Sequence, residues 1–270
     1  MREFYMLNKQ RIVIKVGTST LTHDSGELDL RKMELLVRVL SDIQGAGNEV
    51  ILVSSGAIGI GTAKLALGER PKELRMKQAA AAVGQCSMMH IYDKLFSEYN
   101  RTIAQILLTG DDVDEEDRAM HLSNTFSALL ELGVIPVVNE NDSVSAAEIE
   151  TGTHKVLGDN DTLSAIVAKL CQANLLVILS DIDGLYNKDP RQFPDARLLH
   201  GVTELTPEIM EMAGGAGTSR GTGGMQTKLA AAKIAMSSGF DLVITNSDRI
   251  ENLYDILDEK PVGTRFYSTL

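Results

Sequence analysis

The chain has 270 residues, 44% of them hydrophobic, which is typical of a globular protein with a full core. Acidic residues outnumber basic ones by 37 to 26, so the net charge is −11, and only 4% of residues are aromatic. Such a surface repels phosphate backbones and offers few rings for base stacking, so we expect no nucleic-acid partner. Its longest aliphatic runs are strand-sized, and the first ten residues lack the apolar core of a secretion signal. We therefore expect a cytoplasmic protein with no membrane partner.

Short apolar runs alternate with segments of helical periodicity along the chain. Strands are predicted at 11–16, 49–53, 102–107, 134–138, 175–179 and 241–245, and helices at 33–43, 72–99, 122–130, 163–170 and 225–236. Apolar strands separated by helices indicate a mostly parallel sheet covered on both faces. We expect an α/β fold, a three-layer α/β/α sandwich in a single domain over 1–270. An N-terminal lobe of about 1–173 and a C-terminal lobe of about 174–270 would meet in it.

Several common active-site designs are excluded. The chain has no Gly-Lys dipeptide, hence no Walker A loop, and it lacks GxGxxG, GxSxG and HExxH motifs. Its two cysteines, Cys86 and Cys171, lie far apart with no metal-ligand spacing. We therefore expect two buried thiols and no metal ligands in the protein.

Two predicted strands end in polar residues next to glycine. Lys15 lies near the carboxyl end of the first strand, where open parallel sheets bind ligands, and a lysine there is costly to bury without an anion. Ser55 and Gly56 follow the second strand, in a turn whose N–H groups suit a carboxylate or phosphate. A snorkelling lysine and simple turn chemistry are the alternative interpretations.

Two acidic, amide-rich clusters follow, at 136–142 (PVVNEND) and 158–161 (GDND). The second cluster opens a predicted helix, so Asp159 or Asn160 is a candidate N-cap. The remaining carboxylates would hold a substrate ammonium group or orient lysines.

The C-terminal half contains two more candidate segments. Ser180 and Asp181 follow the strand at 175–179. They are interpreted either as ligand contacts or as the start of a turn. In the segment 221–228 (GTGGMQTK), glycines free backbone donors, and Lys228 lies in the first turn of a helix, where it opposes the helix dipole. A bound polyphosphate makes this arrangement favourable, so the segment predicts a phosphate site rather than an ordinary flexible loop.

In this order, the segments VIKVGTS, VSSGAI, PVVNEND, GDND and GTGGMQTK resemble the signatures of the amino acid kinase family, in particular of members that phosphorylate free glutamate. The resemblance extends from about Lys15 to Thr264. It implies that Lys15 and Lys228 stabilise the transferring phosphoryl group and that Asp161 orients these lysines. It assigns the amino acid substrate to Ser55, Asp142, Asp159 and Asn160. It assigns the nucleotide to Lys15, Ser180, Asp181, Thr222, Gly223, Gly224, Met225, Gln226, Thr227 and Lys228.

The resemblance also implies the partners of the chain. The substrates are L-glutamate and ATP, with Mg²⁺ carried by the ATP phosphates, and the product is L-glutamyl 5-phosphate, in the first step of proline biosynthesis. Proline would act as a feedback inhibitor, the assembly would be a homo-oligomer, and a glutamyl phosphate reductase would receive the product. A C-terminal domain of the RNA-modification type, found in many such members, is expected to be absent.

Two rival functions stay open. One is a related kinase acting on aspartate, acetylglutamate, carbamate or a nucleoside monophosphate; the two acidic clusters favour a free amino acid, whose ammonium group needs carboxylates. The other is a non-catalytic sensor of nucleotide or amino acid. The presence of both Lys15 and Lys228 favours an enzyme, because a sensor needs less neutralisation of charge.

Overall fold

One β-sheet crosses the molecule from edge to edge. The computed structural model describes residues 9–23, 25–144, 159–212 and 224–269, and within them eight strands are ordered β3-β4-β2-β1-β5-β7-β8-β6. The strands are β1 (Arg11–Val16), β2 (Glu49–Ser54), β3 (Ile103–Leu108), β4 (Ile135–Glu140), β5 (Leu175–Ser180), β6 (Gly201–Val202), β7 (Asp241–Asn246) and β8 (Thr264–Phe266). Neighbouring strands pair in parallel except β7 with β8.

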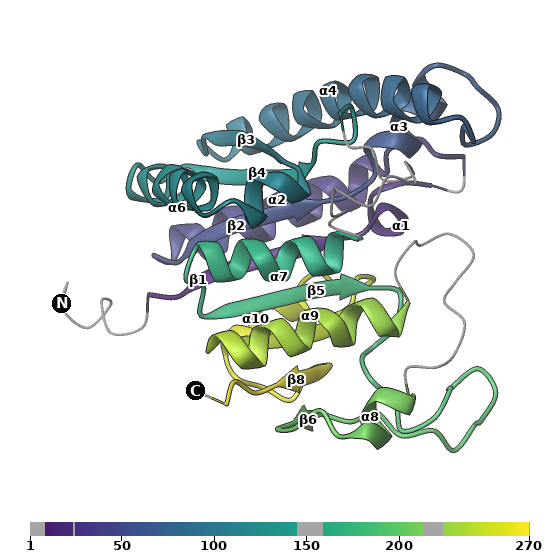
Figure 1. Cartoon of the computed structure of the whole chain (residues 1–270), viewed down its shortest axis with the longest axis vertical. Helices are drawn as coiled ribbons and strands as arrows, with labels where there is room; N and C mark the ends of the chain where they lie inside the picture. Colours follow the sequence, from purple (N-terminus) through teal and green to yellow (C-terminus); the bar gives the residue numbers. More distant parts are fainter. Residues whose placement is uncertain (1–8, 24, 145–158, 213–223, 270) are drawn as a thin grey trace.

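Helices cover both faces of this sheet. They are α1 (Thr18–Leu21), α2 (Leu30–Gly45), α3 (Ala57–Lys64), α4 (Leu74–Glu98), α5 (Gly110–Asp114), α6 (Glu116–Glu131), α7 (Asn160–Leu170), α8 (Pro207–Met212), α9 (Met225–Ser238) and α10 (Asn252–Leu257). Figure 1 shows α6, α7 and α9 in front of the sheet and α2 and α10 behind it. Buried residues of α2, α4 and α10 share one hydrophobic cluster, and those of α6, α7 and α9 share the other. The predicted three-layer α/β/α sandwich is confirmed.

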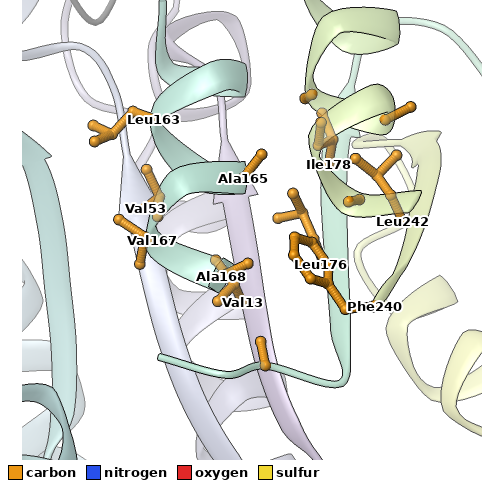
Figure 2. Packing of buried hydrophobic residues seen from close by; sticks show 14 of the residues in the cluster. Val13, Val53, Leu163, Ala165, Val167, Ala168, Leu176, Ile178, Phe240 and Leu242 are labelled. Carbon is orange, nitrogen blue, oxygen red and sulfur yellow. The ribbon is translucent and has the colours of Figure 1, made fainter. Parts of the chain in front are cut away.

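Successive side chains of the central strands belong alternately to the two hydrophobic clusters. In β1, Ile12, Ile14 and Val16 belong to the cluster beneath α2, whereas Val13 belongs to the cluster beneath α7. Figure 2 shows Val13 close to Ala168 of α7. Because side chains alternate along a strand, Lys15 points to the same face as Val13, toward α7 and α9.

The carboxyl ends of β1, β2, β3, β4, β5 and β7 and the first turns of α7 and α9 lie at one edge of the molecule (Figure 1), whereas β6 and β8 run the opposite way. β1 pairs with β2 on one side and β5 on the other, so the segments before and after residue 174 contribute neighbouring strands to a single sheet. In the portion of the chain that the structure covers, none of the helices combines the length and apolar character that a membrane span requires.

One burial prediction is half wrong. Cys171 is buried after α7, but Cys86 is exposed on α4. The Ala-rich sequence around Cys86 is apolar on nearly all sides, so the pattern alone does not identify the outward face of this helix.

Candidate active site

Asp161 lies at the centre of a buried cluster of charges at the carboxyl edge of the sheet. Its Oδ1 is 2.7 Å from Lys15 Nζ, and its Oδ2 is 3.2 Å from Lys228 Nζ. The Asp161 side chain is 1% exposed, and those of Lys15 and Lys228 are 11% and 6% exposed. Two cationic side chains thus share one carboxylate, which leaves the cluster with an excess positive charge suited to an anion.

Opposing effects set the pKa of Asp161. Burial raises it, whereas the charges of Lys15 and Lys228 and a 2.7 Å hydrogen bond from Thr227 Oγ1 lower it, and the resulting pKa is about 2. Asp161 is therefore ionised at neutral pH. A carboxylate in this state attracts and orients both lysines.

Three elements bring this cluster together. Lys15 projects from β1, Asp161 lies in the first turn of α7 and Lys228 in the first turn of α9. α7 and α9 pack against each other on the same face of the sheet. Since both helices begin at the carboxyl edge, their free N–H groups and the positive ends of their dipoles add to the attraction for an anion.

The side chain of Asp159 caps the N-terminus of α7. Its Oδ1 accepts hydrogen bonds from the N–H groups of Asp161 and Thr162 at 2.8 and 2.9 Å, so it is the N-cap of the helix. The capping alternative considered for this residue is therefore realised. Asp159 fixes the turn that presents Asn160 and Asp161.

Ser55 and Asn160 meet beside the charge cluster. Asn160 Nδ2 donates to Ser55 Oγ at 2.6 Å, and the N–H of Ser55 donates to Val16 O at 3.1 Å. Gly56 follows with φ of 110°, a left-handed conformation that side-chain-bearing residues rarely adopt, and it opens α3. The turn after β2 is thereby held against β1 and the start of α7.

Asp142 lines a neighbouring cavity of about 410 Å³ between α4, β3 and the end of β4. Burial and the charge of Glu140 raise the pKa of Asp142 to about 6, although Arg70 lowers it. The cavity wall includes Ala57, only two residues after Ser55, so the cavity adjoins the turn that carries Ser55.

Relative to the cavity of Asp142, Ser180, Asp181 and the start of α9, all expected to bind the nucleotide, lie on the other side of β1. Ser180 ends β5 and donates to Asp181 Oδ1 at 3.2 Å. Gly224 precedes α9, and Met225, Gln226, Thr227 and Lys228 form its first turn. Thr222 and Gly223 lie outside the described residues.

The structure thus unites Lys15, Asp161, Thr227 and Lys228 in one network and links Ser55 to Asn160 beside it. Asp142, Ser180 and Asp181 lie at the ends of β4 and β5, apart from these contacts. The cavity that contains Asp142 is also lined by polar residues that were not anticipated: the exposed Gln105 and Ser143 and the buried Gln85 of α4. Gln85 lies in an Ala-rich helix, and no sequence motif marks it.

The parallel α/β/α fold, with two buried lysines and two helix N-termini at its carboxyl edge, defines a phosphotransferase. The chain belongs to the amino acid kinase family, whose model matches residues 10–246.

Sequence relatives agree with this assignment, and solved structures share the fold. The chain is 54% identical over 259 residues to glutamate 5-kinase of Clostridium perfringens (strain 13 / Type A), covering 96% of each chain. It is 53% identical over 268 residues to glutamate 5-kinase of Carboxydothermus hydrogenoformans, covering 99% of this chain and 70% of that one. The fold is similar to that of carbamate kinase from Giardia lamblia bound to AMP-PNP, with a TM-score of 0.69, 20% identity, and coverage of 96% of this chain and 99% of that one. It is also similar to UMP kinase from Bacillus anthracis, with a TM-score of 0.66, 14% identity, and coverage of 97% of both chains.

Proposed function

We propose that the chain transfers the γ-phosphoryl group of ATP to the side-chain carboxylate of L-glutamate, giving L-glutamyl 5-phosphate and ADP in the first step of proline biosynthesis. The relatives at 54% and 53% identity, both glutamate 5-kinases, support this substrate. The observation that carries the proposed chemistry is the buried carboxylate of Asp161 held between Lys15 and Lys228.

The reaction places its main demand on charge neutralisation. An oxygen of the substrate carboxylate bonds to the γ-phosphorus, while the bond from that phosphorus to the bridging oxygen breaks and its electron pair leaves with ADP. A carboxylate is already nucleophilic at neutral pH, so no general base is needed. Negative charge spreads over the transferring group, and preorganised cations stabilise it.

Lys15 and Lys228 supply these cations. Asp161 accepts a contact from each, so both ammonium groups are held near one point before the substrates arrive. Because one carboxylate serves two lysines, their attraction for the transferring group is only partly neutralised. Asp161 acts through the lysines as a positioning residue.

The substrates occupy opposite sides of this cluster. In our proposal Asp142 receives the substrate ammonium group, Ser55 and Asn160 contact the amino acid, and Asp159 supports that side as the cap of α7. The nucleotide lies with Ser180, Asp181 and the segment 222–228, where the start of α9 suits polyphosphate. The N-terminal lobe of about 1–173 thus binds the amino acid, and the C-terminal lobe of about 174–270 binds ATP.

Mg²⁺ enters as the MgATP complex. In the described ranges no group of three or more His, Cys, Asp or Glu residues is placed to hold a metal ion. Mg²⁺ commonly keeps phosphate oxygens and waters as ligands in such sites. We also assign to the protein a cytoplasmic location, a homo-oligomeric assembly, inhibition by proline and transfer of its labile product to a glutamyl phosphate reductase.

A substrate panel tests the proposal. Release of ADP from MgATP is measured with L-glutamate, L-aspartate, N-acetylglutamate, carbamate and UMP, using Lys228→Ala as the inactive control. We expect the highest kcat/KM with L-glutamate. Faster turnover of another acceptor would overturn the substrate assignment, and binding of glutamate and ATP without any turnover would identify a sensor.

A further inference from the structure

Gln85 is held in the wall of the cavity that contains Asp142. It is 7% exposed and lines this cavity of about 410 Å³. The preceding residue, Gly84, packs on the first turn of α3 so closely that a Cβ there would lie 1.8 Å from Ala57 O. The backbones of α4 and α3 are therefore in close contact at this point, which places Gln85 near the turn after β2.

A single hydrogen bond orients the amide of Gln85. Its Oε1 accepts from Nδ2 of Asn139 at 2.9 Å, and Asn139, near the end of β4, is 2% exposed. The Nε2 group is also buried, yet it has no hydrogen-bond partner in the part of the chain that the structure describes. Buried donors in proteins are nearly always satisfied, so an unused donor on a residue that lines a cavity calls for an acceptor that the described residues do not supply.

Polar residues in the cavity lining also include Gln105, Glu140, Asn141 and Ser143, and among all of them Asp142 and Gln85 form a complementary pair. The carboxylate of Asp142 suits a cation, and the Nε2 group of Gln85 suits an acceptor, which a carboxylate provides most strongly. An α-amino acid carries an ammonium group and a carboxylate on the same carbon. Its head group therefore matches this pair of side chains.

We propose that Gln85 recognises the α-carboxylate of the amino acid substrate while Asp142 receives its ammonium group. Asn139 is the positioning residue: it occupies Oε1 of Gln85 and so leaves Nε2 as the group that donates to the ligand. With the head group in this cavity, the side chain of the substrate extends past Ser55 toward the lysines. This inference rests on the proposed function, because it requires an amino acid substrate.

Two substitutions separate recognition from a structural role. Gln85→Glu keeps an acceptor for Asn139 but replaces the free donor by a negative charge. Gln85→Met removes the donor and breaks the bond to Asn139. If Gln85 binds the substrate, KM for L-glutamate should rise about tenfold in Gln85→Met and more in Gln85→Glu, with KM for ATP within about twofold of wild type. A purely structural role predicts the reverse order, since only Met breaks the internal bond.

Gln172→Glu is the matched control, because it adds the same charge on an exposed turn after α7. Its KM for L-glutamate should equal that of the wild type. Thermal melts identify any variant that fails to fold, and if Gln85→Glu does not fold, an unchanged KM for L-glutamate in Gln85→Met still overturns the inference. A KM for glutamate within twofold of wild type in the folded variants, or a larger rise for Met than for Glu, overturns the inference. Wild-type ADP release that does not depend on glutamate would instead refute the proposed function.

Discussion

The amide of Asn160 donates a 2.6 Å hydrogen bond to Ser55 Oγ and so joins the first turn of α7 to the turn after β2. The next residue, Asp161, holds Lys15 and Lys228. A short chain of polar contacts therefore connects the proposed amino acid side of the site with the cations that face the transferring phosphoryl group. Substitutions along this chain should affect chemistry and substrate binding differently, according to their place in it.

The two lysines should govern the rate of chemistry. Lys15→Ala or Lys228→Ala should lower kcat by roughly 10²-fold or more, about 2.7 kcal/mol of transition-state stabilisation. Substrate affinities should change less, and the double variant should be far from additive because the two residues act as a unit. Steady-state kinetics of ADP release measure these values. Lys233→Ala, at an exposed position of α9, is the control. A near-normal kcat with weak ATP binding would show that the lysine merely anchors the nucleotide.

Asp161 should contribute stability that disappears in acid. Its pKa is lowered from 3.8 to about 2 on folding, so the stabilisation is complete above pH 4 and is lost as the pH falls through 2. A shift of this size corresponds to about 2 kcal/mol. The free energy of unfolding in urea should therefore differ between wild type and Asp161→Asn by more at pH 6 than at pH 3. Asp93→Asn, on the exposed side of α4, should follow the wild type at both values. A difference independent of pH would contradict the assigned charge interactions.

The crossing of α3 and α4 should tolerate no added side chain. A Cβ on Gly61 would lie 1.8 Å from Ala80 O, and one on Gly84 would lie 1.8 Å from Ala57 O. Gly61→Ala and Gly84→Ala should each destabilise the protein by about 1–3 kcal/mol or more, because backbone must move. Gly59→Ala is the matched control: its Cβ would meet Thr18 Cγ2 at 3.6 Å, an ordinary contact. It should be neutral or stabilising by about 0.5–1 kcal/mol in urea unfolding. Equal losses at Gly59 and Gly61 would show that helix crowding is not the cause.

The sequence predicted the central sheet well, since its strands are apolar runs bounded by glycine and polar turns. α3 was not predicted: the segment AIGIGTAK has two glycines and little helical propensity, and its helix depends on contact with α4. β6 and β8 were also missed, because strands of two and three residues leave no recognisable period. Such elements are stabilised by tertiary contacts that local sequence does not record.

The candidate site was likewise only partly predictable from the sequence. The family motifs singled out Lys15, Asp161 and Lys228, but their separation in sequence says nothing of the 2.7 and 3.2 Å contacts that join them. The N-cap role of Asp159 was one of two open interpretations, and only the geometry of α7 distinguishes them. Gln85 had no signal at all, because its chemistry arises from a contact with Asn139 across the fold.

The raised pKa of Asp142 should make both binding and stability depend on pH. Burial and Glu140 place this pKa at about 6 in the folded protein, against 3.8 ordinarily. The carboxylate must be ionised to attract an ammonium group, so kcat/KM for glutamate should fall as the pH drops from 7 to 5. Ionisation of this buried carboxylate also lowers the free energy of unfolding. This destabilisation is absent below pH 3.8 and complete above pH 6. Asp142→Asn should therefore be more stable than wild type to urea at pH 7.5 and equal to it at pH 4. An unchanged pH profile of kcat/KM in this variant would assign the titration to another group.

Asp142 should also decide whether proline shares the glutamate pocket. Proline carries an ammonium group and an α-carboxylate placed as in glutamate, so the cavity of Asp142 suits both head groups. A charge-assisted contact to the ammonium is worth about 1.5–3 kcal/mol, so Asp142→Ala should raise KM for glutamate about tenfold or more. KM for ATP should stay near the wild-type value, because the proposed nucleotide residues lie on the other side of β1. Proline inhibition should weaken in the same variant by a similar factor.

Glutamate saturation curves with and without proline, for wild type and Asp142→Ala, measure both the KM for glutamate and the strength of proline inhibition. If the variant loses glutamate affinity but remains fully sensitive to proline, the inhibitor binds elsewhere. A ligand whose ammonium group binds to Asp142 must lose affinity when this carboxylate is removed.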